Sequence, residues 1–579
     1  MTPLFFLSMT DSGPHIRRGT SFFLIAALAL LTFATLYYTR SLDDNRLTSW
    51  RWCFHQGTTT SVFLAVAAGV VISYLIAFIP VRTRYRAALL FLLAFSASAL
   101  FWSEPEVIVD SSRYFTQAKH LELYGLPYFA EEWGRRIAAW TDMPLVPLLY
   151  GVVFRTFGEV RNYVQIFTSA LFGFTVALTY LTGKELWDEE VGFYGGILLL
   201  GMPYLWSQTP LMLVDVPSTF FLLLAVFTFL RALKKGGVAV FVAAGAITLA
   251  FFSKYSTWLM LSVLAVAAAV YMAEGRSGGD GARKPGDVLR LTLQVLLVAA
   301  VLTGSVCVYK FGVLSDQMSL LMAYQKPGLK RWEESFLSTF VFQIHPFITA
   351  LAIFSAYAAL RKRDLKYVII IWLVVLVVVM QIKRIRYIIM VFPMLSLAAS
   401  YGLREIQDEK IKKFISACAV TSALAVAVFA YLPFLQKLSA VNMRDAGRFL
   451  NTMAGPDVDV FTILPADPVV NPAVAVPVLD IFTEKRIHYD YHDVLSPASR
   501  REITNSALRF TVDYKNPPYY ESGGHAGKER LVAVISENAD DALPADVSRR
   551  IAGYKLLRTF GANEGIFRYR TCVRIYEKS

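Results

Sequence analysis

Ionisable side chains stand at the ends of several long apolar runs of this sequence. They are Asp110, Asp215, Lys254, His345 and the cationic segment Lys383-Arg384-Ile385-Arg386-Tyr387. A charge within or at the edge of a membrane helix costs roughly 2.5 to 3.5 kcal/mol on insertion scales, so each needs a compensating role. A carboxylate can act as a general base, whereas arginine and lysine bind phosphate oxygens. These residue types therefore predict proton transfer beside a bound anionic group, such as the phosphate of a lipid.

Each of these positions also has a structural interpretation. Asp110 could cap the helix that follows it, and Asp215 could tie two helices together. Lys254 could extend to the membrane interface, and His345 could begin an interfacial helix. The cationic segment 383–387 could contact the headgroup of any lipid. Residue type and spacing alone leave both interpretations open.

The composition shows what kind of chain must position these groups. Of 579 residues, 55% are hydrophobic and only 17% are charged, and the mean hydropathy is +0.47. Soluble globular proteins carry roughly a quarter charged residues. The composition therefore excludes a cytosolic enzyme, a disordered scaffold and a secreted disulfide-rich module. The net charge of +13 needs no nucleic acid, because the cytoplasmic loops of membrane proteins collect Lys and Arg.

The four cysteines form no CxxC pair, so neither a zinc site nor a disulfide framework is predicted. The sequence predicts no cofactor and gives no support for a bound divalent metal.

A membrane-spanning helix needs about 20 mainly apolar residues. The continuous apolar runs predict about thirteen such helices and exclude a β-barrel, whose strands would alternate. The predicted spans are 21–38, 61–80, 87–102, 161–182, 191–207, 212–231, 238–253, 256–273, 288–310, 337–360, 367–381, 386–402 and 413–434.

The positive-inside rule orients these helices. With Arg17 and Arg18 in the cytoplasm, almost every basic loop falls on the cytoplasmic side, provided that the proline-containing run 144–157 lies on the membrane surface. These loops are 82–86, 184, 231–235, 276–290, 361–366 and 404–413, and the Gly/Ser/Asp-rich stretch 275–286 among them is a linker. The cationic segment 383–387 then lies outside, together with Asp110, Asp215, Lys254 and His345.

The same orientation predicts two large outer loops, at about 103–160 and 311–336. The chain after residue 434 also lies outside and turns polar, with β-rich runs at 458–464 and 531–535. We therefore predict three parts: a two-helix N-terminal segment (1–86), a membrane module (87–435) and a small extracytoplasmic α/β domain (440–579). Trp133 and Trp140, in the first outer loop, are expected to mark an aromatic belt.

Several of these landmarks, in their order, resemble the GT-C superfamily of polyprenyl-phosphate-sugar-dependent glycosyltransferases. The likeness is nearest to the protein O-mannosyltransferases and the lipid A aminoarabinose transferases. Asp110-Ser111-Ser112-Arg113-Tyr114 looks like the family's D-E-x-x-Y element, with Ser111 in place of the usual Glu. The resemblance implies that Asp110 is catalytic and that Arg113 and Tyr114 lie at the active site.

Later segments continue the resemblance. Residues 143–158 look like the family's K-P-P-L…F-G segment, but Asp142 and Met143 stand where the donor-binding Lys is expected. Asp215 resembles a characteristic acid, Lys254 the Lys of a T-K-G element, and His345 a histidine near the donor site. The run Arg386-Tyr387 to Pro393 looks like the R-Y-x-x-P element, whose Tyr lies near the lipid phosphate.

The resemblance implies a glycosyltransferase with the GT-C fold that moves a sugar from a polyprenyl-phosphate carrier to an acceptor at the outer face. Asp110 would deprotonate the acceptor hydroxyl, and transfer would invert the anomeric carbon. Arg384, Arg386 and Tyr387, with Lys383 and Lys254, would bind the donor phosphate, and Asp215 and His345 would lie nearby. Burial is expected to raise the pKa of Asp110. The acceptor could be a protein, lipid A or another glycan, and the absence of a eukaryotic retention signal favours a bacterial inner membrane.

Two other classes of protein fit some of these features. A transporter or flippase of an amphipathic anion could use the same outer charges, but transporters usually show internal repeats and broken midplane helices, which the sequence lacks. A non-catalytic assembly subunit would leave Asp110 and the cationic segment 383–387 unexplained.

Overall fold

The computed structural model describes residues 14–46, 48–54, 58–80, 83–106, 109–277, 283–325, 334–438, 440–492, 495–506, 508–521, 531–561 and 570–579. Parts of two predicted loops, residues 278–282 of the cytoplasmic linker and 326–333 of the second outer loop, lie outside this description.

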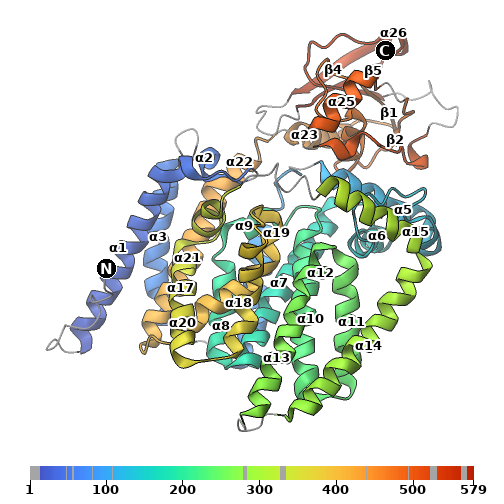
Figure 1. Cartoon of the computed structure of the whole chain (residues 1–579). Coiled ribbons are helices and arrows are strands. Elements are labelled where there is room, and N and C mark those ends of the chain that lie inside the picture. The colour runs from blue at the N-terminus through green and yellow to red at the C-terminus, as the bar shows by residue number, and fades with distance from the viewer. Residues whose placement is uncertain are drawn as a thin grey trace.

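A bundle of helices makes up the larger part of the protein (Figure 1). In the first half of the bundle the helices are α1 (Pro14–Thr39), α2 (Trp50–Cys53), α3 (Thr59–Ile76), α4 (Arg86–Ala99), α5 (Asp110–Glu132), α6 (Leu145–Phe157), α7 (Arg161–Leu186), α8 (Glu189–Leu200), α9 (Pro203–Gln208) and α10 (Asp215–Lys235). In the second half they are α11 (Val238–Ser253), α12 (Ser256–Met260), α13 (Ser262–Arg276), α14 (Pro285–Tyr309), α15 (Phe311–Leu320), α17 (Pro346–Lys362), α18 (Lys366–Val379), α19 (Ile385–Ile388), α20 (Phe392–Leu403), α21 (Glu409–Val426) and α22 (Leu432–Leu435). Short 3-10 and π-helical turns join several of them, at η1 (Arg40–Leu42), η2 (Thr83–Tyr85), η3 (Leu321–Gln325), η4 (Ser338–Gln343), η5 (Ile389–Val391) and η6 (Ala427–Tyr431).

Within the described residues, eight helical stretches are long and apolar enough to cross a membrane. They are Arg18–Leu42, Thr59–Ile76, Arg161–Leu186, Asp215–Lys235, Ser256–Arg276, Pro285–Tyr309, Ile385–Leu403 and Glu409–Leu435. Shorter apolar helices cover Arg86–Ala99, Leu145–Phe157, Val238–Ser253 and Lys366–Val379. The polytopic helical fold is confirmed, and the count of thirteen spans stays a prediction.

The connections between helices gather at two opposite ends of the bundle (Figure 1). Helices α5, α6 and α15 form a layer between the bundle and the C-terminal domain, whereas the α17–α18 and α20–α21 connections lie at the other end. The described parts of the predicted outer and cytoplasmic loops therefore lie at opposite ends of the bundle, and α6, the run expected on the membrane surface, lies in the layer beside the C-terminal domain.

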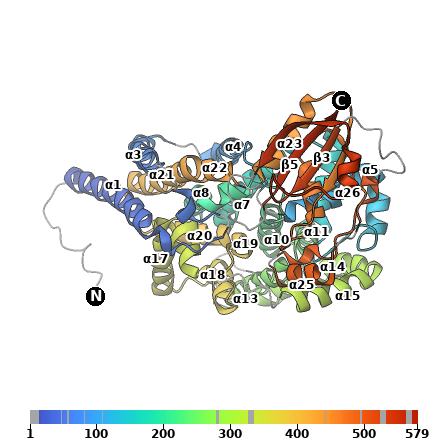
Figure 2. The same ribbon diagram turned by 90° about the horizontal axis from the view of Figure 1, so that it is seen from above.

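The two N-terminal helices pack against α21. Gly69 of α3 allows this close approach, because a Cβ there would stand 3.0 Å from the Thr421 side chain. The Ser73 and Thr421 hydroxyls hydrogen-bond at 3.0 Å, and Arg18 pairs with Asp408 at the far end. Seen from above, α1 and α3 occupy the edge of the bundle opposite the C-terminal domain (Figure 2).

The C-terminal domain holds a five-stranded mixed sheet of order β2-β1-β3-β5-β4. Its strands are β1 (Asp457–Thr462), β2 (Arg486–His488), β3 (Leu531–Ser536), β4 (Tyr554–Gly561) and β5 (Cys572–Lys578). Strand β1 is parallel to β2 and β3, and β5 is antiparallel to β3 and β4. The two predicted β-rich runs are β1 and β3, so the predicted small α/β fold is confirmed.

Both faces of this sheet are covered by apolar contacts, because alternate residues of a strand point to opposite faces. Val458 and Val460 face a core with Met443 and Leu450 of helix α23, whereas Val532 and the neighbouring Val534 face a second cluster. The remaining elements are α23 (Val441–Thr452), η7 (Pro472–Val474), α24 (Ala475–Asp480), α25 (Pro497–Asn505), η8 (Arg509–Thr511), η9 (Pro518–Tyr520) and α26 (Ala545–Arg550). The domain lies over the half of the bundle that contains α5, α10 and α11 (Figure 2).

Candidate active site

Helix α5 presents Asp110 at its first turn. Val109 is the N-cap residue, and the Asp110 side chain does not cap the helix. Its Oδ1 lies 3.0 Å from Nη2 of Arg113, and its Oδ2 lies 2.7 Å from Nη1 of Arg386. The capping interpretation of Asp110 is therefore wrong, and the carboxylate is committed to two arginines.

Helix α10 begins at Asp215, whose side chain is only 1% exposed. Lys254 Nζ lies 2.7 Å from Asp215 Oδ1, and Arg386 Nη2 lies 3.0 Å from Asp215 Oδ2. The backbone of Lys254 is extended and separates α11 from α12, which turns the side chain toward α10 instead of along the helix axis. Lys254 thus pairs with a buried acid and does not extend to the membrane interface.

The turn between α18 and α19 brings Arg386 to both acids. Gln381 has a left-handed backbone (φ 52°) and ends α18, a conformation that commonly terminates helices. The buried Glu334 carboxylate then accepts a hydrogen bond of 3.0 Å from the Ile385 amide and holds the start of α19. The Arg386 side chain is 9% exposed, so this turn brings in a buried cation and does not make a headgroup contact at the surface.

Six side chains of alternating sign form one connected chain of ion pairs, with neighbours 2.7–3.1 Å apart. We call it the ion-pair chain, and its members in order are Asp142, Arg113, Asp110, Arg386, Asp215 and Lys254. Three negative charges balance three positive ones. Apart from the i, i+3 pair within α5, each link joins different segments, so the chain ties α5, α10, α11, α19 and the loop before α6 at one place.

The two acid-bearing helices are held by a further carboxylate that the sequence analysis missed. Glu106, 1% exposed, accepts from the Ser111 hydroxyl at 2.8 Å and from the Met212 amide at 3.0 Å. It also pairs with Arg161 Nε at 3.1 Å. Ser111 follows Asp110 and Met212 precedes the start of α10, so one carboxylate sets the position of both helix ends. The only signal in the sequence was its place four residues before Asp110.

Tyr387 and its neighbours lie beside the ion-pair chain. Lys254 Nζ is 5.0 Å and the Arg384 guanidinium 5.7 Å from the centre of the Tyr387 ring, within the range of cation–π contacts. Lys383 is exposed. The structure therefore groups Arg384, Arg386, Tyr387 and Lys254 at one place, with Lys383 at its exposed margin.

Arg113 and Tyr114 also lie at this site. The Tyr114 hydroxyl is 3.5 Å from Arg113 Nη2, and its side chain is buried. Asp142, which occupies the position where the resemblance implies a donor-binding Lys, accepts from Arg113 at 3.1 Å and from Gln117 at 3.2 Å. That position therefore neutralises an arginine and supplies no cation for phosphate.

His345 lies elsewhere. Its Nδ1 caps α17 by accepting from the Phe347 amide, and its Nε2 is 2.6 Å from the Ser422 hydroxyl of α21. Among the contacts of the described residues, none joins His345 to the ion-pair chain. The structure thus supports the helix-start interpretation of this residue. Trp133 is buried among Leu121, Phe129 and Ile137 and does not mark an aromatic belt.

The charges around Asp110 decide its protonation. Burial raises the pKa of this carboxyl, but Arg113, Arg386 and Arg384 outweigh burial and leave its pKa below the ordinary value. The expected upward shift is therefore wrong in direction for this state. Burial raises the pKa of the neighbouring Asp142 carboxyl, with Arg113 opposing it.

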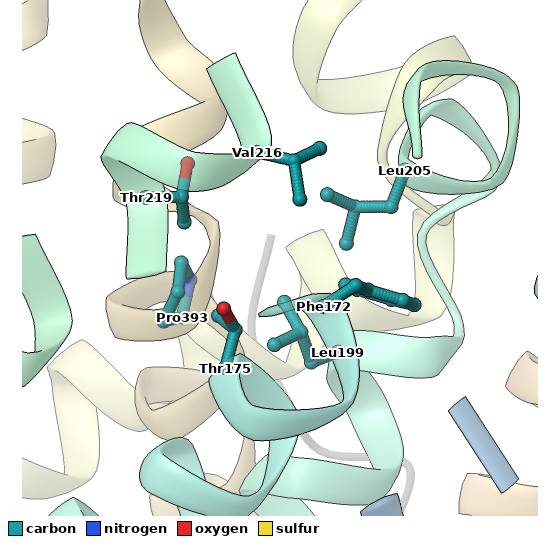
Figure 3. A pocket seen from close by; sticks show the side chains of 7 residues that line it. All are labelled: Phe172, Thr175, Leu199, Leu205, Val216, Thr219 and Pro393. Carbon is teal, nitrogen blue, oxygen red and sulfur yellow. The ribbon is translucent and has the colours of Figure 1, made fainter. Parts of the chain in front are cut away.

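A small apolar pocket lies beside the first turns of α10, which contribute Val216 and Thr219 to its lining (Figure 3). Its lining residues are Phe172, Thr175, Leu199, Leu205, Val216, Thr219 and Pro393. The Thr175 and Thr219 hydroxyls donate to backbone carbonyls of their own helices, so neither has a proton left to donate to a phosphate. This pocket has no charged lining group, and it is a packing space rather than a site for a phosphate. Among the residues that the structure describes, no three His, Cys, Asp or Glu side chains come together in a group that could hold a metal ion.

Comparison with known proteins defines the class. Residues 142–303 match the family described as dolichyl-phosphate-mannose-protein mannosyltransferase. The fold matches ArnT from Cupriavidus metallidurans bound to undecaprenyl phosphate, with a TM-score of 0.54, 11% identity, and 84% of this chain and 97% of that chain covered. The apo state of the same protein matches with a TM-score of 0.53, 12% identity and the same coverage. No curated protein sequence matches the chain.

The family match and the shared fold together class the chain as a membrane glycosyltransferase with the GT-C fold. The resemblance predicted from the sequence is confirmed at this level. At 11% identity, the likeness to ArnT concerns the fold, and the roles of individual residues rest on the geometry of this chain.

Proposed function

We propose that this protein transfers a sugar from a polyprenyl-phosphate carrier to an acceptor hydroxyl, with inversion, at the end of the bundle that faces the C-terminal domain. The observation that carries the proposal is the ion-pair chain. It places a carboxylate, Asp110, within 2.7 Å of a buried arginine, Arg386, beside Lys254 and Tyr387. A general base and a cationic phosphate site are what this reaction requires.

The donor phosphate would bind Arg386, Lys254, Arg384 and Tyr387, with Lys383 at the exposed margin of the site. Arginine suits this role because its planar guanidinium can hold two phosphate oxygens at once. An undecaprenyl phosphate bound to ArnT supports a polyprenyl carrier of this kind, and the matched family is described by a dolichyl-phosphate donor.

Binding of the donor must exchange ion pairs. Arg386 already holds Asp110 and Asp215, and Lys254 already holds Asp215. A phosphate that takes Arg386 Nη1 displaces Asp110 from that cation. Asp110 then keeps only Arg113, and its pKa rises from the depressed value that the arginines impose. The donor would thereby turn a weak base into a stronger one at the moment it is needed.

The chemical step follows from this arrangement. Asp110 takes the proton of the acceptor hydroxyl, whose oxygen forms a bond to the anomeric carbon. The bond between that carbon and the phosphate oxygen breaks on the opposite face, and the phosphate leaves with the electron pair. Arg386 and Lys254 stabilise the charge that develops on the leaving phosphate.

The membrane module would span residues 87–435, flanked by the two-helix segment 1–86 and the domain 440–579. The C-terminal domain and Asp110 would face the periplasm of a bacterial inner membrane, as the positive-inside rule predicts. The site lies at one end of the bundle, which favours a transferase over a transporter that alternates access across the midplane.

Mass spectrometry of lipids that co-purify with the protein tests the donor. Wild type should retain polyprenyl phosphate or its sugar conjugate, and Arg384→Ala/Arg386→Ala should lose it. Arg404→Ala, an arginine at the other end of the bundle, is the matched control and should retain it. Equal amounts of bulk phospholipid alone in all three samples would contradict the proposal. Full transfer activity in a folded Asp110→Asn variant would contradict the assignment of the base.

A further inference from the structure

One face of helix α5 packs against the C-terminal domain. Val109 packs in an apolar cluster with residues of that domain, and the Thr116 carbonyl lies 3.4 Å from the Tyr519 hydroxyl. The His120 ring meets the Tyr519 ring edge-on at 5.0 Å, and Arg113 lies under a ring of the same domain. Positions 109, 113, 116 and 120 recur at i, i+4, i+7 and i+11, which is one face of a helix. The C-terminal domain therefore contacts the helix that carries Asp110 along three turns.

Arg113 is the member of the ion-pair chain that this contact covers. Its guanidinium lies 4.5 Å from the centre of the Phe510 ring, which belongs to the C-terminal domain, and 5.9 Å from the Trp140 ring. The two rings meet edge-on at 5.7 Å. Arg113 is only 10% exposed while it bridges Asp110 and Asp142. Two aromatic rings from different parts of the chain thus shield the arginine that pairs with the candidate base.

The Trp140 backbone adds an independent observation. Its φ of 51° lies in the left-handed region, which a bulky side chain adopts only where its surroundings hold it there. Strained backbone positions of this kind cluster at functional sites. In this conformation the Trp140 ring meets the Phe510 ring of the C-terminal domain, and its expected place in an aromatic belt stays a prediction.

The segment that carries Phe510 is itself fixed. The fully buried Thr511 hydroxyl accepts from the Asn471 amide at 3.0 Å and donates to the Leu508 carbonyl at 2.8 Å. Leu508 and Phe510 join Val470 in the apolar cluster that covers Val109. The ring of Phe510 is thus presented to α5 by a braced turn.

We propose that the C-terminal domain completes the active site through Phe510, a positioning residue that closes over Arg113 and, with Trp140, holds it between Asp110 and Asp142. The inference rests on the proposed transferase function and adds a part of the chain that lies outside the membrane module. Excluding water strengthens the two ion pairs of Arg113, because electrostatic interactions grow as the local dielectric falls. The Asp110 carboxylate then keeps its orientation through Arg113 when the donor phosphate pairs with Arg386.

Kinetics of the full-length protein test this role. Phe510→Ala should lower kcat at least tenfold and leave KM for the lipid-linked sugar within twofold, because the phosphate contacts are untouched. Phe510→Tyr, which keeps the ring, should restore kcat. Phe560→Ala is the matched control, because Phe560 is also half-buried in the C-terminal domain with an arginine 5.0 Å over its ring but lies on β4, away from α5. Equal losses in Phe510→Ala and Phe560→Ala, or none in either, would overturn the proposal.

A second measurement does not depend on transfer. Phenylglyoxal modifies exposed arginines, and peptide mass spectrometry reports the extent at each one. Phe510→Ala should increase labelling of Arg113 severalfold and leave Arg386 unchanged, whereas Phe560→Ala should change neither. Unchanged labelling of Arg113 in Phe510→Ala would refute the closure. If wild type used no polyprenyl-phosphate sugar, the proposed function would fail while this measurement still decided whether Phe510 covers Arg113.

Discussion

The Asp110→Asn variant should bind undecaprenyl phosphate more tightly than wild type, although it lacks the candidate base. In the structure Asp110 Oδ2 pairs with Arg386 Nη1 at 2.7 Å, and this nitrogen is the one that a donor phosphate would need. The Asp110→Asn side chain has nearly the same shape but no charge, so it competes more weakly for Arg386. It also no longer repels the incoming phosphate.

The size of the effect follows from Coulomb's law. Two unit charges 4 Å apart interact by about 1 kcal/mol in water and about 4 kcal/mol at an effective dielectric of 20. Asp110 is only 15% exposed, but Arg113 neutralises much of its charge, so the low end of this range applies. A gain of about 1.4 kcal/mol corresponds to roughly tenfold tighter binding.

The assay is equilibrium binding of undecaprenyl phosphate to the purified protein in lipid nanodiscs. Asp142→Asn is the matched control, because Asp142 belongs to the ion-pair chain but pairs with Arg113 and not with Arg386. Its affinity should stay within twofold of wild type. Weaker binding by Asp110→Asn would refute the reasoning, since it would mean that Asp110 orients Arg386 for the phosphate and does not compete for it. Unchanged binding by Arg386→Ala would instead refute the phosphate site itself.

Further predictions concern the groups around the ion-pair chain. Asp215→Asn should destabilise the protein by about 3–5 kcal/mol, because it leaves Arg386 and Lys254 short of a buried partner; an unchanged thermal midpoint in detergent would contradict this. Glu106→Gln should lower transfer more than donor affinity, because the ends of α5 and α10 lose a shared anchor; a loss of donor affinity alone would argue against that role. Asp480→Asn should loosen the C-terminal domain, because Asp480 pairs at 2.7 Å with Lys119 of α5, and limited proteolysis should release the domain faster than in wild type. His345→Ala should lower the thermal midpoint and leave transfer per folded molecule unchanged, and a selective loss of transfer would return His345 to the active site.

The predictions that succeeded were those that depend on local pattern. Continuous apolar runs predicted a polytopic helical protein, and the polar chain after residue 434 predicted a separate sheet domain. The ordered motifs indicated the GT-C class, which the family match over 142–303 and the fold bear out. The cost of burying a charge also singled out Asp110, Asp215, Lys254 and Arg386 without any knowledge of the fold. The structure brings these four side chains together, and their roles in the reaction stay a prediction.

The tertiary structure decided which of the charged side chains pair with one another. Asp110 and Arg386 are 276 residues apart, and only the packing of α5, α10 and the α18–α19 turn brings them to 2.7 Å. That contact reversed the expected direction of the Asp110 pKa shift, because burial and neighbouring charges act oppositely and only coordinates show which is larger. The position of His345 was likewise decided by packing: its ring hydrogen-bonds to Ser422 of α21 and not to the ion-pair chain. Sequence by itself determined which residues could carry charge into the membrane, whereas the fold determined which of them meet, because the strength of an ion pair depends on distance and burial and not on order along the chain.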